Sequence, residues 1–223
     1  MMKISDTVEE ILYSSEIALS ALNGGFLNLS AYAKAIRKDV EARTKKPVRT
    51  GSIVVALSRM KKTVTKREPL LPEPEIEDLS VKSGLVEATY DRTRDNLARL
   101  RALYGDRRIR TDDFFMVTQG TGEITIVALE QALPRIRAAM QPAKAKASIT
   151  GLVGVTARFD EKYIAIPNII FAFVRRLALK RINIVEIVST YTELTFIVAQ
   201  HDLPEAFLAL NEFFHTEKSD PNK

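Results

Sequence analysis

An internal repeat limits what this 223-residue chain can fold into more than any other feature of its sequence. EITIVALEQALPRIRAAM (residues 123–140) aligns without a gap on ELTFIVAQHDLPEAFLAL (193–210), and upstream SGLVEAT (83–89) aligns on TGLVGVT (150–156). Between these two blocks the second copy is three residues longer. Such self-similarity indicates two copies of one supersecondary unit, residues 76–141 and 145–215.

Within each copy, the apolar periodicity predicts the order strand, helix, strand, strand, helix. The entry strands are long, IEDLSVKSGLVEATY (76–90) and ASITGLVGVTARF (147–159). A full βαββαβ unit needs a fourth strand, but only HTEKSDPNK follows the final helix. Either each long entry strand bends and serves both copies, or residues 76–81 complete the second copy.

The hairpin predicted over residues 181–200 is apolar on both faces. Leu194, Phe196 and Val198 form one face, whereas Ile197 and Ala199 lie on the other. Successive strand residues point to opposite faces, so both faces should be buried. One should carry the helices of its own unit, and the other needs a cover from the sister copy or from a second chain.

The N-terminal segment has a different character, because it is helical and basic. Residues 30–67 contain twelve Lys or Arg against two acidic residues, whereas residues 71–223 are nearly balanced. We expect helices over about 5–22 and 30–43, and a short third helix that starts near Ser52 after Thr50-Gly51. The run 53–57 is apolar all round, which favours a buried third helix.

This arrangement resembles a helix-turn-helix head, whose third helix would lie in the major groove of DNA. The candidate DNA-binding residues are Lys45, Lys46, Arg49, Thr50, Ser52, Arg59, Lys61 and Lys62. Three-helix heads with a basic face also serve as dimerisation caps or protein-docking modules, and that alternative stays open. The predicted organisation is a head (1–67), a Pro-rich linker (68–75), a first unit (76–144), a second unit (145–215) and a disordered tail (216–223).

The repeat also carries a pattern of glycine, proline and asparagine. The second copy has Gly151 and Gly154 in its first strand, Pro167 at the expected helix start and Ile182-Asn183-Ile184 opening its second strand. With the order of elements, this pattern resembles the ACT domain, a small ferredoxin-like regulatory unit. The tandem arrangement, over roughly residues 76–215, is similar to the regulatory region of aspartokinases. The resemblance implies an α+β fold of two ferredoxin-like, ACT-type βαββαβ units preceded by the all-α head.

The resemblance also implies a ligand site, since ACT domains hold an amino acid or a similar metabolite at an interface between two units. Carried over to this sequence, the ligand-binding positions are Asp160, Pro167, Asn168, Asn183 and Ile184. Asn168 stands where the family usually has glycine. The first copy lacks both the proline and the asparagine, with Asp113 in place of Asn183, so the second copy is the better candidate.

Catalytic chemistry is not indicated. The chain has no cysteine and only two histidines, His201 and His215, so it offers no thiolate metal site and no convincing nucleophilic catalytic set, and no metal is expected. The lysine- and glycine-rich kinase motif of an aspartokinase is absent, and no cofactor is expected. No apolar run reaches the roughly 18–20 residues that span a bilayer, and no signal-peptide core is present, so we expect a cytoplasmic protein.

The sequence therefore predicts a ligand-responsive regulatory protein that is not an enzyme. Its ACT-like units would bind an amino acid or related small metabolite, and its basic head would bind DNA, in a homo-oligomer, most simply a homodimer. The alternative is a non-catalytic regulatory or scaffolding subunit that senses an amino acid and docks onto a biosynthetic enzyme.

Overall fold

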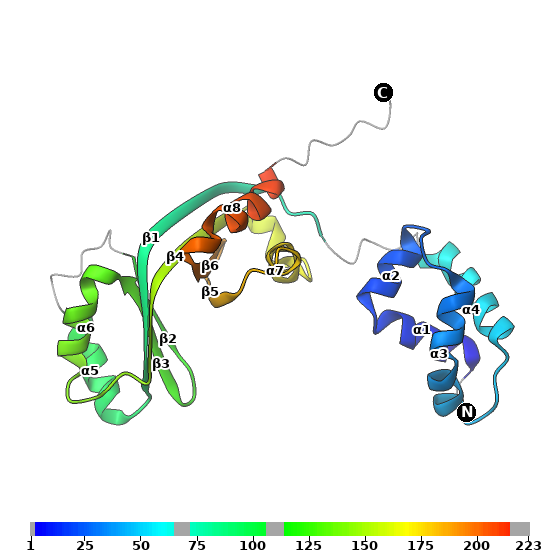
Figure 1. The fold of residues 1–223 in the computed structure, drawn as a ribbon, viewed down its shortest axis with the longest axis horizontal. Helices are drawn as coiled ribbons and strands as arrows, with labels where there is room; N and C mark the ends of the chain where they lie inside the picture. The colour runs from blue at the N-terminus through cyan, green and yellow to red at the C-terminus, as the bar shows by residue number, and fades with distance from the viewer. Residues whose placement is uncertain (1–2, 65–71, 106–113, 215–223) are drawn as a thin grey trace. The chain divides into compact units, whose positions relative to one another are not determined.

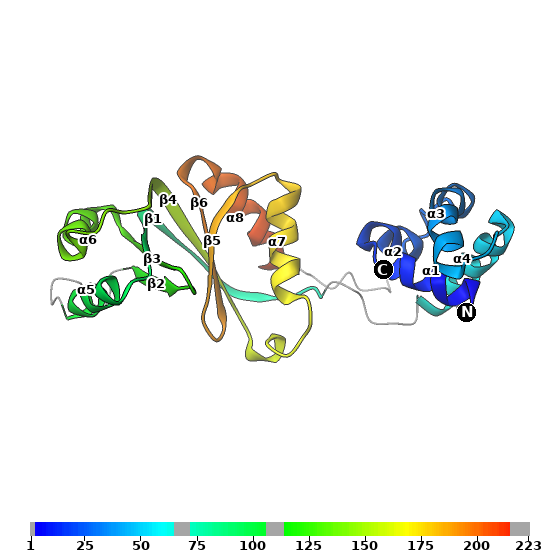
Figure 2. The same cartoon turned by 90° about the horizontal axis from the view of Figure 1, so that it is seen from below.

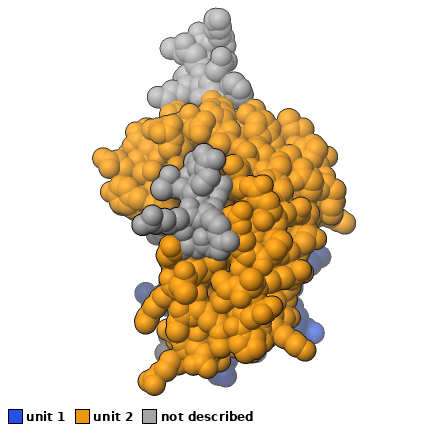
Figure 3. Space-filling view, turned by 90° about the vertical axis from the view of Figure 1, so that its left-hand side faces the viewer, with its two compact units in different colours: residues 1–69 blue, residues 70–223 orange. Residues whose placement is uncertain are grey.

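The computed structural model describes residues 3–64, 72–105 and 114–214. The predicted tail and Asp113 lie outside these residues, as do residues 68–71 of the predicted linker. The chain divides into two compact units, Met1–Pro69 and Leu70–Lys223, which are coloured separately in Figure 3.

The N-terminal unit is a bundle of four helices, α1 (Ile4–Tyr13), α2 (Glu16–Asn23), α3 (Leu29–Thr44) and α4 (Thr50–Val64) (Figure 1). The single helix expected over 5–22 is wrong, because Ser15 is extended and its side chain accepts a hydrogen bond from the Ala18 N–H. A serine that caps a new helix in this way ends the previous one. The expected burial of 53–57 on all sides is also wrong, since Val55 is 51% exposed while Ile53 and Leu57 are buried.

The C-terminal unit is built on one six-stranded antiparallel sheet with the order β2-β3-β1-β4-β6-β5. Its elements are β1 (Ile76–Asp91), α5 (Arg94–Tyr104), β2 (Phe115–Gln119), β3 (Glu123–Leu129), α6 (Leu133–Met140), β4 (Ala147–Phe159), α7 (Ile169–Leu179), β5 (Ile184–Ser189), β6 (Glu193–Ala199) and α8 (Leu203–Asn211). The unit thus combines helices with an antiparallel sheet, as the α+β prediction requires. In the repeat alignment, the first residue of β3 is equivalent to that of β6, and the first residue of α6 is equivalent to that of α8.

The two long strands β1 and β4 pair along almost their whole lengths, and Leu85 lies opposite Leu152. These two leucines are equivalent in the repeat, so an approximate twofold axis passes between them. Residues 85–91 of β1 lie between β3 and the start of β4, whereas residues 76–82 pair with the end of β4, which in turn pairs with β6. Each entry strand therefore serves both halves of the sheet.

A change of pairing register accompanies this exchange. The register of β1 on β4 shifts between Lys82 and Leu85. Nearby, Gly84 and Gly151 occupy equivalent positions and have φ angles of 70° and 67°. Glycine adopts this left-handed conformation without the steric cost that a Cβ brings. The two glycines therefore permit the irregularity at which each long strand passes from one half to the other.

The two faces of the sheet are covered differently. Helices α5 and α6 pack on the first half, and α7 and α8 on the second (Figure 2). On the other face, Leu85 and Val127 from the first half form one buried cluster with Leu152 and Ile197 from the second. The second apolar face of the 181–200 hairpin is thus covered by the sister half of the same chain.

Candidate ligand-binding site

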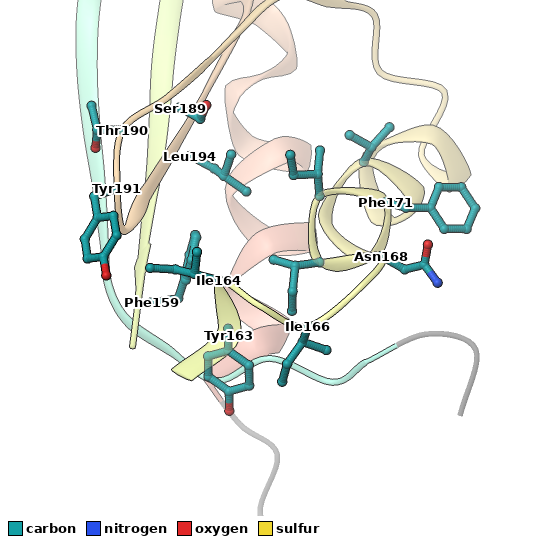
Figure 4. Close-up of a pocket in the computed structure, with 13 residues that line it drawn as sticks. Phe159, Tyr163, Ile164, Ile166, Asn168, Phe171, Ser189, Thr190, Tyr191 and Leu194 are labelled. Atoms are coloured by element: carbon teal, nitrogen blue, oxygen red, sulfur yellow. The ribbon is translucent and has the colours of Figure 1, made fainter. Parts of the chain in front are cut away.

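The second half of the sheet carries an open pocket of about 630 Å³. It lies between the connection from β4 to α7 and the turn that joins β5 to β6 (Figure 4). Its lining residues are Phe159, Tyr163, Ile164, Ile166, Asn168, Ile169, Ile170, Phe171, Val174, Ser189, Thr190, Tyr191 and Leu194.

The connection that forms one wall is held by local hydrogen bonds. Directly after β4, the Asp160 carboxylate accepts a hydrogen bond from the Lys162 N–H at 2.8 Å, which begins a short 3₁₀ turn over Glu161–Tyr163. The Tyr163 ring is buried, and its hydroxyl accepts a hydrogen bond from the Glu75 N–H at 3.1 Å. The second of these hydrogen bonds connects the wall of the pocket to the residue that precedes β1.

The chemistry of the pocket is apolar with a polar rim. None of the described residues that line it is charged, and its polar groups include Asn168, Ser189, Thr190 and the Tyr191 hydroxyl. Several wall residues stay exposed to solvent despite being large and apolar: Ile164, Ile166, Ile170, Phe171 and Tyr191. Exposed apolar side chains gathered around a hollow are typical of a ligand or partner site. In the part of the chain that the structure describes, no group of three or more acidic, histidine or cysteine residues is arranged to hold a metal ion.

The predicted ligand-binding residues fall in two places. Asn168 lines the pocket, while Asp160 and Pro167 lie in the same connection. Asn183 and Ile184 lie at the far end of β5, since Ile184 pairs with Val198 whereas Ser189, beside the pocket, pairs with Leu194. The structure thus brings the first three together and separates the last two from them.

The expectation that Pro167 stands at the start of the helix is wrong. Helix α7 begins at Ile169, after Asn168 has adopted a left-handed conformation with φ 69°. Asparagine tolerates this left-handed conformation better than most residues do. Sequence reasoning missed the turn residues 189–191, although Tyr191, an aromatic residue at a predicted hairpin turn, was a signal for them.

The basic residues of the N-terminal unit lie around α3 and α4. Lys45, Lys46 and Arg49 are in the connection between these helices, where Lys45 has φ 56°, and Thr50 begins α4. On α4, the exposed residues include Ser52, Arg59, Lys61 and Lys62. Beside the start of α4, Lys34, Arg37 and Lys38 of α3 line a second hollow of about 520 Å³ together with Thr50.

Comparisons of sequence gave no match to any known protein-family model or curated protein. Comparison of structures gave clear similarities. The regulatory subunit of aspartate kinase from Thermus thermophilus is matched at a TM-score of 0.53 and 12% identity, over 63% of this chain and 99% of that one. Aspartate kinase from Clostridium acetobutylicum is matched at a TM-score of 0.53 and 13% identity, over 68% of this chain and 37% of that one. Aspartate kinase from Synechocystis is matched at a TM-score of 0.51 and 18% identity, over 74% of this chain and 31% of that one.

At these identities the similarity establishes a fold. The neighbour that is matched over almost its whole length is a regulatory subunit, and the two complete kinases are matched over about a third of their lengths. The chain therefore has a fold like that of an aspartate kinase regulatory region, which supports the ACT-like architecture. The helix-turn-helix character of the head stays a prediction.

Proposed function

We propose that this protein is a non-catalytic, ligand-responsive regulator whose C-terminal unit consists of two ACT-type ferredoxin-like units, residues 76–144 and 145–215. The proposal is carried by the apolar pocket at the start of α7, in a chain whose fold is like that of a regulatory subunit. The strand exchange between β1 and β4 supports a tandem arrangement in which the two units form one body.

The pocket favours an amino acid with a bulky apolar side chain, or a related metabolite. Apolar walls bury a hydrocarbon group, which contributes about 25 cal/mol per Å² of apolar surface removed from water. The Asn168 amide has both a donor and an acceptor, so it can contact the carboxylate or the ammonium of such a ligand at the rim. Free N–H groups at the start of α7 favour the carboxylate.

A thermal-shift screen of the full chain against the twenty amino acids tests this function. An apolar amino acid at about one hundred times its Kd adds about 2.7 kcal/mol to stability, which raises Tm by several degrees. Ile170→Glu places a charge in the pocket wall and should abolish the shift. Leu208→Glu, the same change at an exposed site on α8, should leave it intact. No shift with any amino acid, or an equal loss in both variants, contradicts the proposal.

The Asn168→Gly variant tests whether the side-chain amide of Asn168 contacts the ligand. Glycine keeps the left-handed conformation that Asn168 adopts, so the wall of the pocket should be preserved while the amide is removed. We expect this variant to bind the same amino acid more weakly than the parent chain does. Unchanged affinity would mean that Asn168 does not contact the ligand.

We further propose that the head binds DNA through α4 and the connection before it, in a homodimer. The amphipathic character of α4 supports this, because the helix buries Ile53 and Leu57 and leaves Ser52, Ser58 and Arg59 exposed. The remaining proposed contacts are Lys45, Lys46, Arg49, Thr50, Lys61 and Lys62. Together with Arg59, these residues supply six cations that could neutralise DNA phosphates.

Salt-dependent DNA binding by the full chain tests the head. The logarithm of the affinity should fall linearly with the logarithm of salt concentration, and removing one phosphate contact should reduce the slope by about 0.9. Arg59→Gln should weaken binding, whereas Arg158→Gln, which removes the same charge from the C-terminal unit, should not. Equal effects of the two variants would indicate attraction by net charge alone.

Two exposed apolar side chains favour the second candidate, a subunit that docks onto an enzyme. Ile17 on α2 and Phe26 just after it are 81% and 87% exposed. Residues of this kind are typical of protein contacts rather than of phosphate contacts. Stoichiometric recovery of a biosynthetic enzyme by the intact chain, lost in an Ile17→Ser and Phe26→Ser double variant, would favour docking over DNA binding.

A further inference from the structure

The first half of the sheet has a cavity of its own, with a different chemistry. It has a volume of about 440 Å³ and lies where β1 ends, beside the last turn of α6 and the connection from α6 to β4. Its lining residues are Tyr90, Arg137, Gln141, Pro142, Ala143, Lys144 and Ala145.

Tyr90 gives the cavity a buried polar group without a partner. The side chain is 1% exposed, and its hydroxyl has no hydrogen-bond partner among the described residues. A buried hydroxyl normally has a partner, because leaving it without one costs free energy. Burial raises the pKa of Tyr90, and the Arg137 guanidinium counteracts part of that rise, so the hydroxyl lies within electrostatic reach of a cation.

The charged side chains among the described residues that line the cavity, Arg137 and Lys144, are both positive. Arg137 and Lys144 take part in no ion pair with any residue that the structure describes, and no described residue places a carboxylate in the lining of the cavity. Lys146, two residues further on, shows the contrast: its ammonium pairs with Glu123 at 2.5 Å. Two cations, an amide from Gln141 and a hydroxyl donor therefore surround a space much larger than the roughly 30 Å³ of one water molecule.

We propose that this cavity binds a small anion through a carboxylate or phosphate group, with Arg137 and Lys144 neutralising its charge and the Tyr90 hydroxyl donating to one of its oxygens. Charge-assisted hydrogen bonds of this kind are the strong ones, and Arg matches the planar geometry of both groups. The site lies in the opposite half of the sheet from the apolar pocket, and it does not depend on what that pocket binds.

Titration calorimetry of the full chain at constant ionic strength tests the site, with inorganic phosphate in one arm and succinate in the other. The stronger of the two identifies the group that the cavity prefers. Tyr90→Phe and Arg137→Gln should each weaken binding of that anion about tenfold or more. Arg101→Gln, which removes an exposed arginine from α5 of the same half, should leave the affinity unchanged.

The unfolding temperature of the Tyr90→Phe variant distinguishes a hydroxyl that binds a ligand from one that stabilises the fold. In the absence of any anion, Tyr90→Phe should unfold at the same temperature as the parent chain or higher, because it removes a buried group without a partner. A lower unfolding temperature, with no binding in either arm, would mean that the hydroxyl holds only an ordered water and would overturn the proposal. Equal weakening by Arg101→Gln, or wild-type affinity in Tyr90→Phe and Arg137→Gln, would also overturn it.

Discussion

Truncation of the two leucines at the twofold axis tests whether the two halves of the sheet form one cooperative body. Leu85 and Leu152 are 0% and 1% exposed, lie directly opposite each other in the β1–β4 ladder and share a cluster with Val127 and Ile197. Each Leu→Ala change should therefore cost about 2–5 kcal/mol of unfolding free energy. In the double variant the second truncation enlarges a cavity that already exists, so its cost should fall below the sum by about 0.5–3 kcal/mol.

Hydrogen exchange measured by mass spectrometry is the appropriate assay, because peptides from β1, β3, β4 and β6 report on the C-terminal unit alone. Leu12→Ala is the matched control, since Leu12 is equally buried but lies in the N-terminal unit. Leu12→Ala should leave the exchange rates of those peptides unchanged. Its cost in unfolding free energy should add to that of Leu152→Ala to within about 0.5 kcal/mol.

The reasoning is refuted if the halves respond separately. Leu85→Ala should speed exchange in β6 as well as in β3, because the cluster joins Ile197 to Val127. Faster exchange confined to β3, or full additivity of Leu85→Ala with Leu152→Ala, would mean that the halves open independently and that the cluster does not couple them.

Three further changes test the same junction. Gly154→Ala should cost about 1–3 kcal/mol in urea unfolding, because a Cβ there would lie 3.2 Å from Leu85 Cδ1 and 3.3 Å from Ile197 Cδ1, and adding Ile197→Val should recover part of that loss. Gly151→Ala should cost about 1–2 kcal/mol through its φ of 67°, and parent-like stability would show that the strand can pass between the halves without a left-handed residue. Burial, followed by the charge of Glu186, raises the pKa of Glu87 above its ordinary 4.5, so the contribution of Glu87 to stability is complete below that value and is lost as pH rises through the folded-state pKa. Glu87→Gln should therefore gain stability relative to the parent chain as the pH rises above 4.5, and parallel curves of stability against pH for the two proteins would contradict this.

The repeat made much of the fold predictable. A gapless alignment carries residues 123–140 onto 193–210, and the structure places a strand, a 3₁₀ turn and a helix at matching positions in both segments. The entry strand over 147–159 was predicted to the residue, since its β-branched and apolar run has clear ends. Patterns of this kind are local, and the sequence contains all that they need.

Long-range pairing was harder to predict. Two arrangements of the missing fourth strand were open, and only the ladder between β1 and β4 distinguishes them. The helix expected over 5–22 failed for a local reason, because the capping bond of Ser15 competes with the helical hydrogen bond there. The candidate site needed residues 159–174 and 189–194 together, and no spacing along the chain brings a hairpin turn to the start of a helix.

The two cavities lie where the copies of the repeat differ. Nine residues separate Phe159 from Ile169 in the second copy, and they form one wall of the apolar pocket. In the first copy α5 begins at Arg94, soon after β1 ends at Asp91, so no such wall can form. Conversely, Tyr90 is aligned with Ala157, which has no hydroxyl to donate. The strands in which the copies agree hold the two halves together, while the residues proposed to bind ligands lie in the connections and at single positions where the copies have diverged.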